Sequence, residues 1–247
     1  MIYGLLQART DSTRLPKKVL KEVLNKSMII HQLERTAKSK LIDKLILVTS
    51  DEASDDKLAQ QVKNNNFNIF RGSKDNVLKR FFDAIPEAKE NDIVVRLTGD
   101  CPLHDAKIID ETIENLEDFD YISNSVKPIY PDGFDVEVFR FSALKDAFQN
   151  AKLKSELEHV TPYIRNSGKF KIANLEKKPL YSDWRLTVDE PEDFEVIKNI
   201  FEHFGDNNFS FAEVIEFLES NLHILEKNSH INRNEGYQKS LKEDKTL

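Results

Sequence analysis

Short apolar runs alternate with longer amphipathic stretches along most of the chain. The runs that predict β-strands are residues 2–6, 45–49, 67–70, 93–97, 119–123, 134–139, 170–175 and 184–188. The stretches with apolar residues at helical spacing are 28–38, 55–64, 76–84, 106–116, 142–149, 191–204 and 211–222. Strands that alternate with helices of this length predict an α/β fold with a mostly parallel sheet, covered by helices on both faces.

The extent of this alternation of strands and helices predicts the domain organisation. No Gly/Ser-rich or Pro-rich linker interrupts it, so we expect a single domain over residues 1–226. Within that domain, the region of about 119–188 is richer in strands, which predicts an antiparallel excursion at the edge of the sheet. Residues 227–247 are predicted to form a polar C-terminal tail.

Local signals mark the start of three predicted helices. Ser27 is a candidate N-cap for the helix at 28–38. Pro191 opens another helix at a position where its missing N–H costs nothing. Ser210 and Glu213 have the spacing of a capping box, in which each residue bonds to the backbone of the other.

The composition narrows the class of protein. Only one of the 247 residues is a cysteine, which excludes a disulfide framework and a Cys-rich zinc site. The 36 Lys and Arg residues are outnumbered by 43 Asp and Glu residues, giving a net charge of −7, whereas a nucleic-acid binder needs a basic surface. No apolar run approaches the roughly 18–20 residues of a membrane span, and no secretory signal opens the chain. We therefore expect a cytoplasmic protein that binds neither nucleic acid nor a membrane.

A cluster of basic and hydroxyl residues follows the first predicted strand. Its members are Arg9, Thr10, Ser12, Thr13, Arg14, Lys17 and Lys18. The loop after the first strand of an α/β sheet lies at the carboxyl edge, where ligands bind. Guanidinium groups bind phosphate oxygens in pairs, so a triphosphate suits this loop, although a solvated basic loop is the alternative. The glycine spacing of a Walker A or dinucleotide loop is absent.

Two aspartates follow predicted strands that lie far apart in the chain. Asp100 comes after the strand 93–97, and Asp189 comes after the strand 184–188. Two such carboxylates can share a divalent cation, and oxygen ligands favour Mg²⁺ or Mn²⁺ over Zn²⁺. The alternatives are that Asp100 caps a turn and that Asp189 stabilises the start of the next helix. Cys101 is expected to be a small buried residue, because no His or Asn pattern supports a nucleophile.

Polar residues on one predicted strand and in the segment 156–159 are further candidates. Asp135 and Glu137 lie on the same face of the strand 134–139, where they either orient a polyhydroxylated ligand or face solvent. Glu156 and His159 are three residues apart, a spacing that places two residues on one face of a helix. The alternative for His159 is a purely structural role.

The order and spacing of these segments resemble the SpsF-type cytidylyltransferases, which are related to CMP-KDO synthetase and acylneuraminate cytidylyltransferase. The resemblance is most specific in residues 7–20, 96–103, 131–139 and 184–193, and it extends to 230–237. The chain departs from the family pattern at Asp11 and Lys17, where the family often has glycine. The resemblance implies a Rossmann-like, three-layer α/β fold with a mixed, mostly parallel sheet of the nucleotide-diphospho-sugar transferase type.

The resemblance also implies roles for individual residues. Residues expected to bind the nucleotide are Gln7, Ala8, Arg9, Thr10, Ser12, Arg14, Lys18, Thr49, Ser50, Arg71, Gly72, Ser73, Thr98 and Gly99. Residues expected to bind the acceptor are Asp132, Asp135, Glu137, Glu156, His159 and Arg185. Lys18, Asp100 and Arg14 are expected in catalysis, and Asp100 and Asp189 are expected to hold Mg²⁺.

The implied reaction is transfer of CMP from CTP to an acceptor sugar acid or phosphorylated small molecule, with release of pyrophosphate, in the biosynthesis of a surface polysaccharide or glycan. The family also leads us to expect a homodimer. One alternative is a glycosyltransferase of related fold, since Asp118 and Asp120 match the Asp-x-Asp metal motif of such enzymes. A non-catalytic nucleotide-binding protein is the other alternative.

Overall fold

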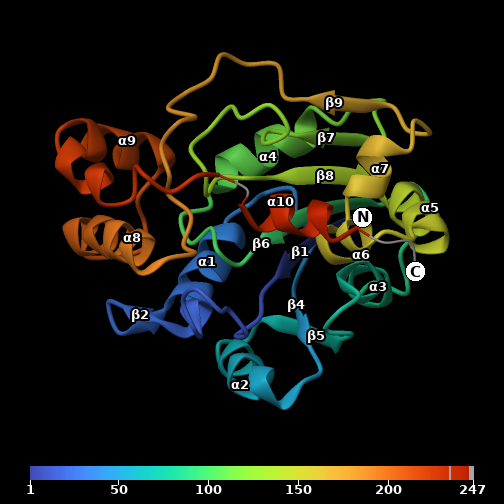
Figure 1. Ribbon diagram of the computed structural model, residues 1–247, viewed down its shortest axis with the longest axis horizontal. Helices are drawn as coiled ribbons and strands as arrows, with labels where there is room; N and C mark the ends of the chain where they lie inside the picture. Colours follow the sequence, from blue (N-terminus) through green and yellow to red (C-terminus); the bar gives the residue numbers. More distant parts are fainter. Residues whose placement is uncertain (234, 245–247) are drawn as a thin grey trace.

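A twisted central sheet organises the protein (Figure 1), and the computed structural model describes residues 1–233 and 235–244. In these residues the sheet has seven strands in the order β5-β4-β1-β6-β8-β7-β9. The strands are β1 (Ile2–Gln7), β4 (Lys44–Ser50), β5 (Asn68–Gly72), β6 (Ile93–Thr98), β7 (Tyr121–Ser123), β8 (Glu137–Arg140) and β9 (Ile172–Asn174). A separate small hairpin joins β2 (Glu22–Val23) to β3 (Lys26–Ser27).

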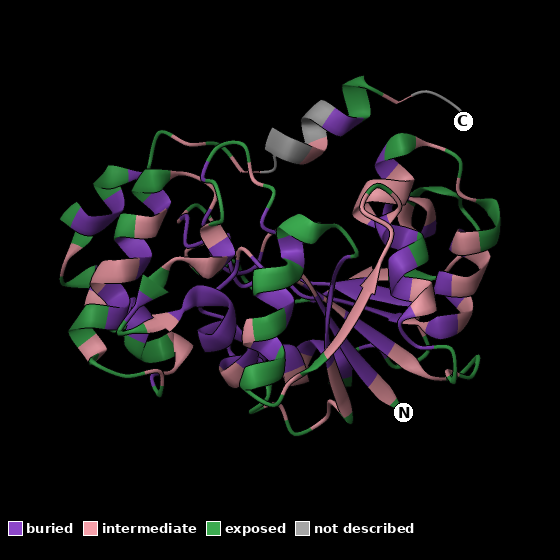
Figure 2. Cartoon of the chain, turned by 90° about the horizontal axis from the view of Figure 1, so that it is seen from below, coloured by how far each residue is buried: buried purple, intermediate pink, exposed green. Residues whose placement is uncertain are grey.

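Helices cover both faces of the sheet, as the sequence predicts. They are α1 (Met28–Thr36), α2 (Asp56–Asn64), α3 (Val77–Asp83), α4 (Ala106–Glu114), α5 (Phe141–Asn150), α6 (Lys154–His159), α7 (Pro162–Asn166), α8 (Pro191–Phe204), α9 (Phe211–Glu219) and α10 (Glu235–Lys242). Figure 2 shows buried strands in the middle and exposed residues on the outer surfaces of the helices. No helix in the described part of the chain has the length and apolar character that crossing a membrane requires.

Alternating side chains of the strands supply two hydrophobic cores. In β1, Leu5 belongs to the core beneath α3, α5 and α7, whereas Leu6 belongs to the core beneath α1, α4 and α8. In β6, Val94 belongs to the same core as Leu5, and Val95 belongs to the same core as Leu6. Because successive side chains of a strand point to opposite faces, a continuous apolar strand is the pattern that a sheet buried on both faces requires.

Most predicted elements form, with ends that differ by a few residues. The predicted strand at 184–188 is wrong: this segment is extended but makes only an isolated bridge, between Asp132 and Arg185. The sequence predicts the antiparallel excursion at the edge of the sheet, whereas β8, from the strand-rich region 119–188, lies inside the sheet and pairs antiparallel with both β6 and β7. The hairpin β2–β3 is not among the predicted elements.

The helix starts agree with their sequence signals at two of three places. Pro191 is in the first turn of α8, and Ser210 and Glu213 form the predicted capping box of α9, with Ser210 Oγ 2.6 Å from the Glu213 carboxylate. Ser27 does occupy the N-cap position of α1, but its side chain makes no capping hydrogen bond. The predicted polar tail contains a helix, α10, while its residues 234 and 245–247 lie outside the described part of the chain.

The register between β1 and β6 brings two loops together at the carboxyl edge. Gln7 pairs with Thr98, so both strands end at the same level. The Gly99 N–H then donates to the Gln7 carbonyl at 2.7 Å. A Cβ at Gly99 would lie 2.7 Å from the Ala8 Cβ, so only glycine permits this approach.

Asp55 ties the loop after β1 to the end of β4. It is 1% exposed, and one of its oxygens accepts from the Thr10 amide and hydroxyl, each at 2.7 Å. Its other oxygen accepts from the Thr49 hydroxyl at 2.9 Å and from the Ser50 hydroxyl at 2.5 Å. Burial alone would raise the pKa of Asp55, but the hydrogen bonds from Ser50 and Thr10 lower it below its usual value.

A second close backbone contact holds the segment 184–188 in place. Gly133 has a φ of 113°, and a Cβ at this position would lie 2.4 Å from the Leu186 carbonyl oxygen. The Leu186 amide in turn donates to the Asp132 carbonyl at 2.6 Å. This contact fixes the approach of Asp189 to the sheet.

We expect Gly133→Ala to lower the free energy of unfolding by about 2–4 kcal/mol, because the methyl group overlaps Leu186 and the backbone is strained. Urea denaturation followed by circular dichroism measures this change. Gly168→Ala is the matched control: Gly168 has a φ of 73°, but an added Cβ meets no atom within 4 Å. The control should lose about 1–2 kcal/mol, from backbone strain alone. Equal losses in the two variants would contradict the close contact.

We expect Asp55→Ala to lower the free energy of unfolding by about 3 kcal/mol, because it leaves several buried donors without an acceptor. Asp56→Ala is the matched control, since Asp56 is exposed and pairs with Arg71 at the surface, and it should cost about 1 kcal/mol or less. Losses of the same size would show that Asp55 does not hold the loop.

The same aspartate should add an acid-dependent component to stability. Because the pKa of Asp55 is lower in the folded protein, its stabilisation is complete above the unfolded pKa of about 3.9 and is lost as the pH falls below that value. Asp55→Asn cannot titrate, so its stability should fall less steeply between about pH 4 and pH 2. Urea denaturation at several acidic pH values measures both slopes, and equal slopes would contradict the assignment.

Candidate active site

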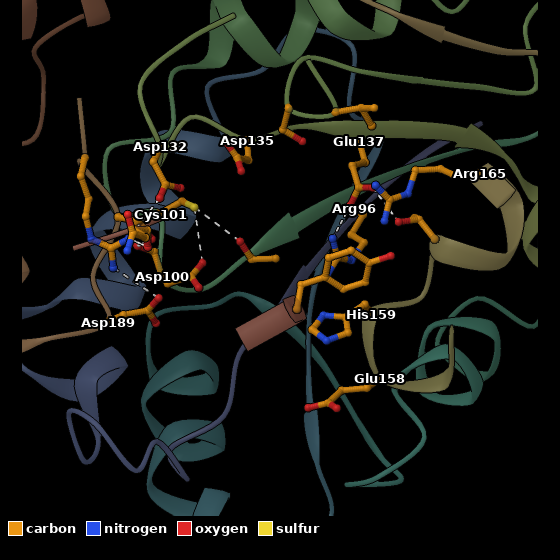
Figure 3. A pocket seen from close by; sticks show the side chains of 18 of the residues that line it. Arg96, Asp100, Cys101, Asp132, Asp135, Glu137, Glu158, His159, Arg165 and Asp189 are labelled. Carbon is orange, nitrogen blue, oxygen red and sulfur yellow. Dashed lines mark hydrogen bonds and ion pairs between the residues drawn. The ribbon is translucent and has the colours of Figure 1, made fainter. Parts of the chain in front are cut away.

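Two adjoining cavities open at the carboxyl edge of β1 and β6. The loop cavity, of about 700 Å³, lies against the segment after β1. The sheet cavity, of about 500 Å³, lies against β6 and β8 (Figure 3). Residues that line both cavities are Arg9, Arg14, Asp100, Glu158 and Asp189. The two cavities therefore form one continuous site.

The loop cavity gathers many of the residues that the sequence assigns to the nucleotide. These are Gln7, Ala8, Arg9, Ser12, Arg14, Lys18 and Gly99. Asp11 also lines this cavity, and its carboxylate pairs with Lys74 at 2.7 Å. Lys17 has a φ of 55°, the left-handed conformation that favours glycine, and it directly precedes the short 3-10 helix η1 (Lys18–Leu20). This conformation explains why glycine is suited to position 17.

Lys18 lies between the two aspartates that the sequence assigns to a metal. Its Nζ is 2.6 Å from Asp189 Oδ1 and 3.6 Å from Asp100 Oδ2, and it also donates to the Val188 carbonyl at 2.8 Å. Burial alone would raise the pKa of Asp100, but the Lys18 ammonium lowers it to about 2. Burial would likewise lower the pKa of Lys18, but Asp100 and Asp189 raise it above its usual value. Asp100 and Lys18 are therefore both ionised at neutral pH.

Two arginines also contact Asp189. Arg14 Nη2 lies 2.9 Å from Asp189 Oδ2, and Arg185 Nη2 lies 3.5 Å from the same oxygen. Arg185 is itself fixed by two hydrogen bonds of 2.8 Å to the buried carboxylate of Asp193. The backbone just before Asp189 is also held close to Asp100, because the Val188 amide donates to the Asp100 carbonyl at 2.8 Å.

The carboxylates around Lys18 offer oxygen ligands of the kind that a divalent cation takes. In residues 1–233 and 235–244, no cluster of three or more His, Cys, Asp or Glu side chains is arranged to hold a metal. Asp100 and Asp189 nevertheless both approach the single ammonium of Lys18, so they present carboxylate oxygens to one small region. Mg²⁺ is commonly held by one or two carboxylates, water and a substrate phosphate, and these two aspartates fit that pattern.

In the sheet cavity, Glu137 is the centre of a buried polar network. Its carboxylate accepts a hydrogen bond from Arg96. It also accepts hydrogen bonds from the hydroxyls of Tyr121 and Thr161, and both of these are 2.6 Å long. Burial alone would raise the pKa of Glu137, but the charge of Arg96 is the main influence that lowers it. Arg96 also donates to the side chain of Gln7 at 3.1 Å, which connects the two cavities.

A second group of carboxylates lines the opposite side of the sheet cavity, as Figure 3 shows. Asp132 pairs with Arg185 at 3.2 Å, and Asp135 pairs with Arg233. Burial and then repulsion from Asp135 raise the pKa of Asp132 to about 7. Burial also raises the pKa of Asp135. This side therefore offers two carboxyl groups, each paired with an arginine, whose negative charge is nevertheless disfavoured by burial.

His159 and Glu156 have different environments on α6. His159 lines the sheet cavity, and its Nε2 is 3.0 Å from Ser240 Oγ. Burial, followed by repulsion from Arg96, lowers the pKa of His159 to about 4, so its ring is neutral at pH 7. Glu156 does not line either cavity; its carboxylate accepts from the amides of Lys152 and Leu153 and so caps the helix.

Several residues that the sequence assigns to the nucleotide lie outside both cavities. They are Thr10, Thr49, Ser50, Arg71, Gly72 and Ser73. The first three bond to Asp55, and Arg71 donates to the carbonyls of Ser50 and Glu52. Thr98 instead lines the sheet cavity. The assignment of the six residues to a nucleotide stays a prediction, while Thr10, Thr49 and Ser50 join the loop after β1 to the end of β4 through Asp55.

The structure adds site residues that the sequence analysis missed. They are Arg96, Glu158, Thr161, Arg165, Arg233 and Tyr237. One signal was present for Arg96, since a charged residue in the otherwise apolar run 93–97 is costly to bury without a partner. The resemblance over residues 230–237 includes Arg233 and Tyr237 but assigns them no role, and both reach the site from the C-terminal segment.

Comparison with known proteins gives a consistent result. A family model described as cytidylyltransferase matches residues 3–231. The chain is 34% identical to the spore coat polysaccharide biosynthesis protein SpsF of Bacillus subtilis, over 89% of this chain and 95% of that protein. A solved structure of a cytidylyltransferase from Leptospira borgpetersenii has a TM-score of 0.86 and 33% identity, covering 94% of this chain and 99% of the other.

A more distant structure shares the fold. The structure of CMP:2-keto-3-deoxy-manno-octonic acid synthetase complexed with CTP has a TM-score of 0.62 and 16% identity, and it covers 82% of this chain and 98% of that one. The predicted nucleotide-diphospho-sugar transferase fold is thus confirmed. The family match, the SpsF relative and the conserved architecture lead to one conclusion: the chain belongs to the cytidylyltransferase family and is a CTP-dependent nucleotidyltransferase of the SpsF type.

Proposed function

We propose that the protein transfers CMP from CTP to an acceptor sugar acid or a phosphorylated small molecule and releases pyrophosphate. The observation that supports this most strongly is the junction of the two cavities. Cations from the loop after β1 meet the carboxylates of Asp100 and Asp189 at that junction. A nucleotide in the loop cavity would therefore place its phosphates next to an acceptor in the sheet cavity.

In this proposal, CTP lies in the loop cavity with its triphosphate on Arg9, Arg14 and Lys18. Guanidinium and ammonium groups are suited to this task because they offer paired donors and a mobile point charge. The relative with a similar fold whose structure contains CTP supports the choice of nucleotide. The SpsF name supports a role in the biosynthesis of a surface polysaccharide.

The acceptor oxygen attacks the α-phosphorus, the bond to the β-phosphate bridging oxygen breaks, and pyrophosphate leaves with that oxygen. Asp100 and Asp189 would hold Mg²⁺, which when bound neutralises phosphate charge and lowers the pKa of an acceptor hydroxyl. Arg14 and Lys18 contribute by positioning phosphate oxygens and compensating their charge. Such a reaction needs little covalent help from the protein, so fixed charges and alignment supply the catalysis.

The sheet cavity suits a polyhydroxylated, anionic acceptor. Arg96 and Arg165 lie on one side of it, and Asp132 and Asp135 lie on the other (Figure 3). Cations can bind a carboxylate or phosphate of the acceptor, while carboxylates accept hydrogen bonds from its hydroxyl groups. A nonulosonic acid, a KDO-like sugar, a sugar phosphate and a polyol phosphate all have this chemistry. A homodimer and a cytoplasmic location stay predictions.

We expect the purified protein to release pyrophosphate only when CTP, Mg²⁺ and an acceptor from this group are present. A coupled pyrophosphate assay with each of the four nucleoside triphosphates, combined with mass spectrometry of the product, measures this. A CMP-linked product supports the proposal. Preference for another triphosphate would contradict the CTP assignment, and nucleotide binding without turnover across the acceptors would favour a non-catalytic binding protein.

Asp100→Asn should reduce the rate by at least about 100-fold, because it removes charge from the metal-binding pair and from the partner of Lys18. Asp118→Asn is the matched control and also tests the glycosyltransferase alternative. Asp118 pairs with Lys171 at the surface and lines neither cavity. A wild-type rate for Asp100→Asn would contradict the metal assignment, and a large loss for Asp118→Asn would favour the Asp-x-Asp motif.

Arg9→Ala and Lys18→Ala should each raise the KM for CTP by about tenfold or more, since each removes one phosphate-binding cation. Lys17→Ala is the control within the same loop, because Lys17 carries the same charge but lines neither cavity. Steady-state kinetics with varied CTP measures the effect. An equal rise in all three variants would show only a general dependence on the charge of the loop.

A further inference from the structure

Two stretches of the chain, residues 228–233 and 235–244, lie along the open side of the site and are called the C-terminal segment below. Figure 1 shows α10 in front of the sheet, next to α6. Asn232 and Tyr237 line the sheet cavity, and Ser240 and Glu243 line the loop cavity. A segment that the sequence predicts as a polar tail therefore contributes to the walls of both cavities.

The first part of this segment is fixed to the acidic side of the sheet cavity. Asn228 is 1% exposed and donates to the Arg185 carbonyl at 3.0 Å and to the Asp193 carboxylate at 2.9 Å. Arg185 in turn donates to the Asn232 carbonyl at 3.3 Å. These bonds attach the segment to the same arginine that contacts Asp189.

Arg233 continues this attachment with ionic contacts. Its guanidinium pairs with Asp135, lies 3.7 Å from Asp132, and donates to the Tyr130 carbonyl at 3.4 Å. Its side chain is 17% exposed, so its charge is largely removed from water. Arg233 therefore sets how much negative charge this side of the cavity presents to a ligand.

The second part of the segment is fixed to α6, on the opposite side of the cavity. The ring of Tyr237 lies edge to face against His159, with centroids 5.1 Å apart, and lies 5.5 Å from the Arg165 guanidinium. Asp244 accepts from the amide and the hydroxyl of Ser155, both at 2.8 Å. The segment thus connects the two sides of the cavity across its opening.

We propose that this segment closes the acceptor pocket, and that Tyr237 and Arg233 determine how tightly the acceptor binds. The inference rests on the proposed function, because it takes the sheet cavity as the acceptor site. Tyr237 offers a ring face and edge against which a sugar ring can pack, and it holds His159 and Arg165 toward the cavity. Arg233 orients Asp132 and Asp135 so that their remaining oxygens accept from acceptor hydroxyl groups.

A kinetic comparison tests the role of Tyr237. Tyr237→Ala should raise the KM for the acceptor by about tenfold or more while changing the KM for CTP less than about twofold. Leu241→Ala is the matched control, since Leu241 is an exposed apolar residue on the same helix that lines neither cavity. Arg233→Gln should likewise raise the KM for the acceptor and leave the KM for CTP nearly unchanged. An unchanged KM for the acceptor overturns the proposal, and a lower KM overturns it too, because the segment would then obstruct the pocket.

A second measurement requires no acceptor and no turnover. Cys101 is the only cysteine in the sequence, is 3% exposed, and lines the sheet cavity, so its reaction with iodoacetamide reports access to that cavity. Tyr237→Ala should be alkylated several-fold faster than the wild type, whereas Leu241→Ala should match it. Intact-protein mass spectrometry gives the rates for all variants at one fixed pH, so the comparison reports how easily the reagent reaches the thiol.

The two measurements separate failure of this inference from failure of the proposed function. A wild-type protein that forms no CMP-linked product contradicts the proposed function. The alkylation rates then still decide closure: a faster reaction in Tyr237→Ala supports it, and a rate equal to the wild type overturns it. Where the product forms but neither the acceptor KM nor the alkylation rate changes, only the role of the C-terminal segment is rejected.

Discussion

The site depends on one ammonium group placed between two carboxylates. Asp100 and Asp189 come from distant parts of the chain, and bringing two negative charges together in a partly buried place is unfavourable without a cation. Lys18 supplies that cation, at 2.6 Å from one aspartate and 3.6 Å from the other. Burial alone would move the pKa of Asp100 up and that of Lys18 down, yet each moves in the opposite direction. The attraction between them therefore exceeds the cost of burial.

This ion pair also explains several backbone features around it. Lys18 reaches the aspartates because Lys17, before it, adopts a left-handed conformation that turns the loop into η1. Asp100 can approach because Gly99 lies against β1 without a Cβ. Asp189 approaches because Gly133 lets the preceding segment pack closely. Unusual backbone positions thus occur where the chain must bring three charged side chains to one point.

The sequence predicts the framework well and the contacts of hydroxyl groups poorly. Apolar strands and amphipathic helices show where the sheet lies and which loops follow its carboxyl ends, so the loop after β1 and Asp100 could be placed in advance. A threonine or serine in such a loop has no signature that separates ligand contact from internal bonding. Thr10 and Ser50 bond to Asp55, a partner that only the folded chain reveals.

The wrong strand at 184–188 has a similar cause. Trp184, Leu186 and Val188 alternate with polar residues as in a strand, but the backbone of this segment bonds to single residues, Asp132 and Asp100. Alternation records which side chains are buried, and not whether a neighbouring strand is present. The roles of Arg233 and Tyr237 were hidden for a related reason, since each reaches its partners only through long-range packing of the C-terminal segment.

Charge pairing within the chain has a consequence for how the site can select a ligand. Arg96 is paired with Glu137, and Arg233 is paired with Asp135. These groups are held in place before any ligand arrives, so little reorganisation is needed when charge develops nearby. Such a pair contributes binding energy only when the ligand makes hydrogen bonds to the donors and oxygens that still point into the cavity. Selection therefore rests on the arrangement of polar groups around a ligand of fixed shape, and net charge alone is insufficient.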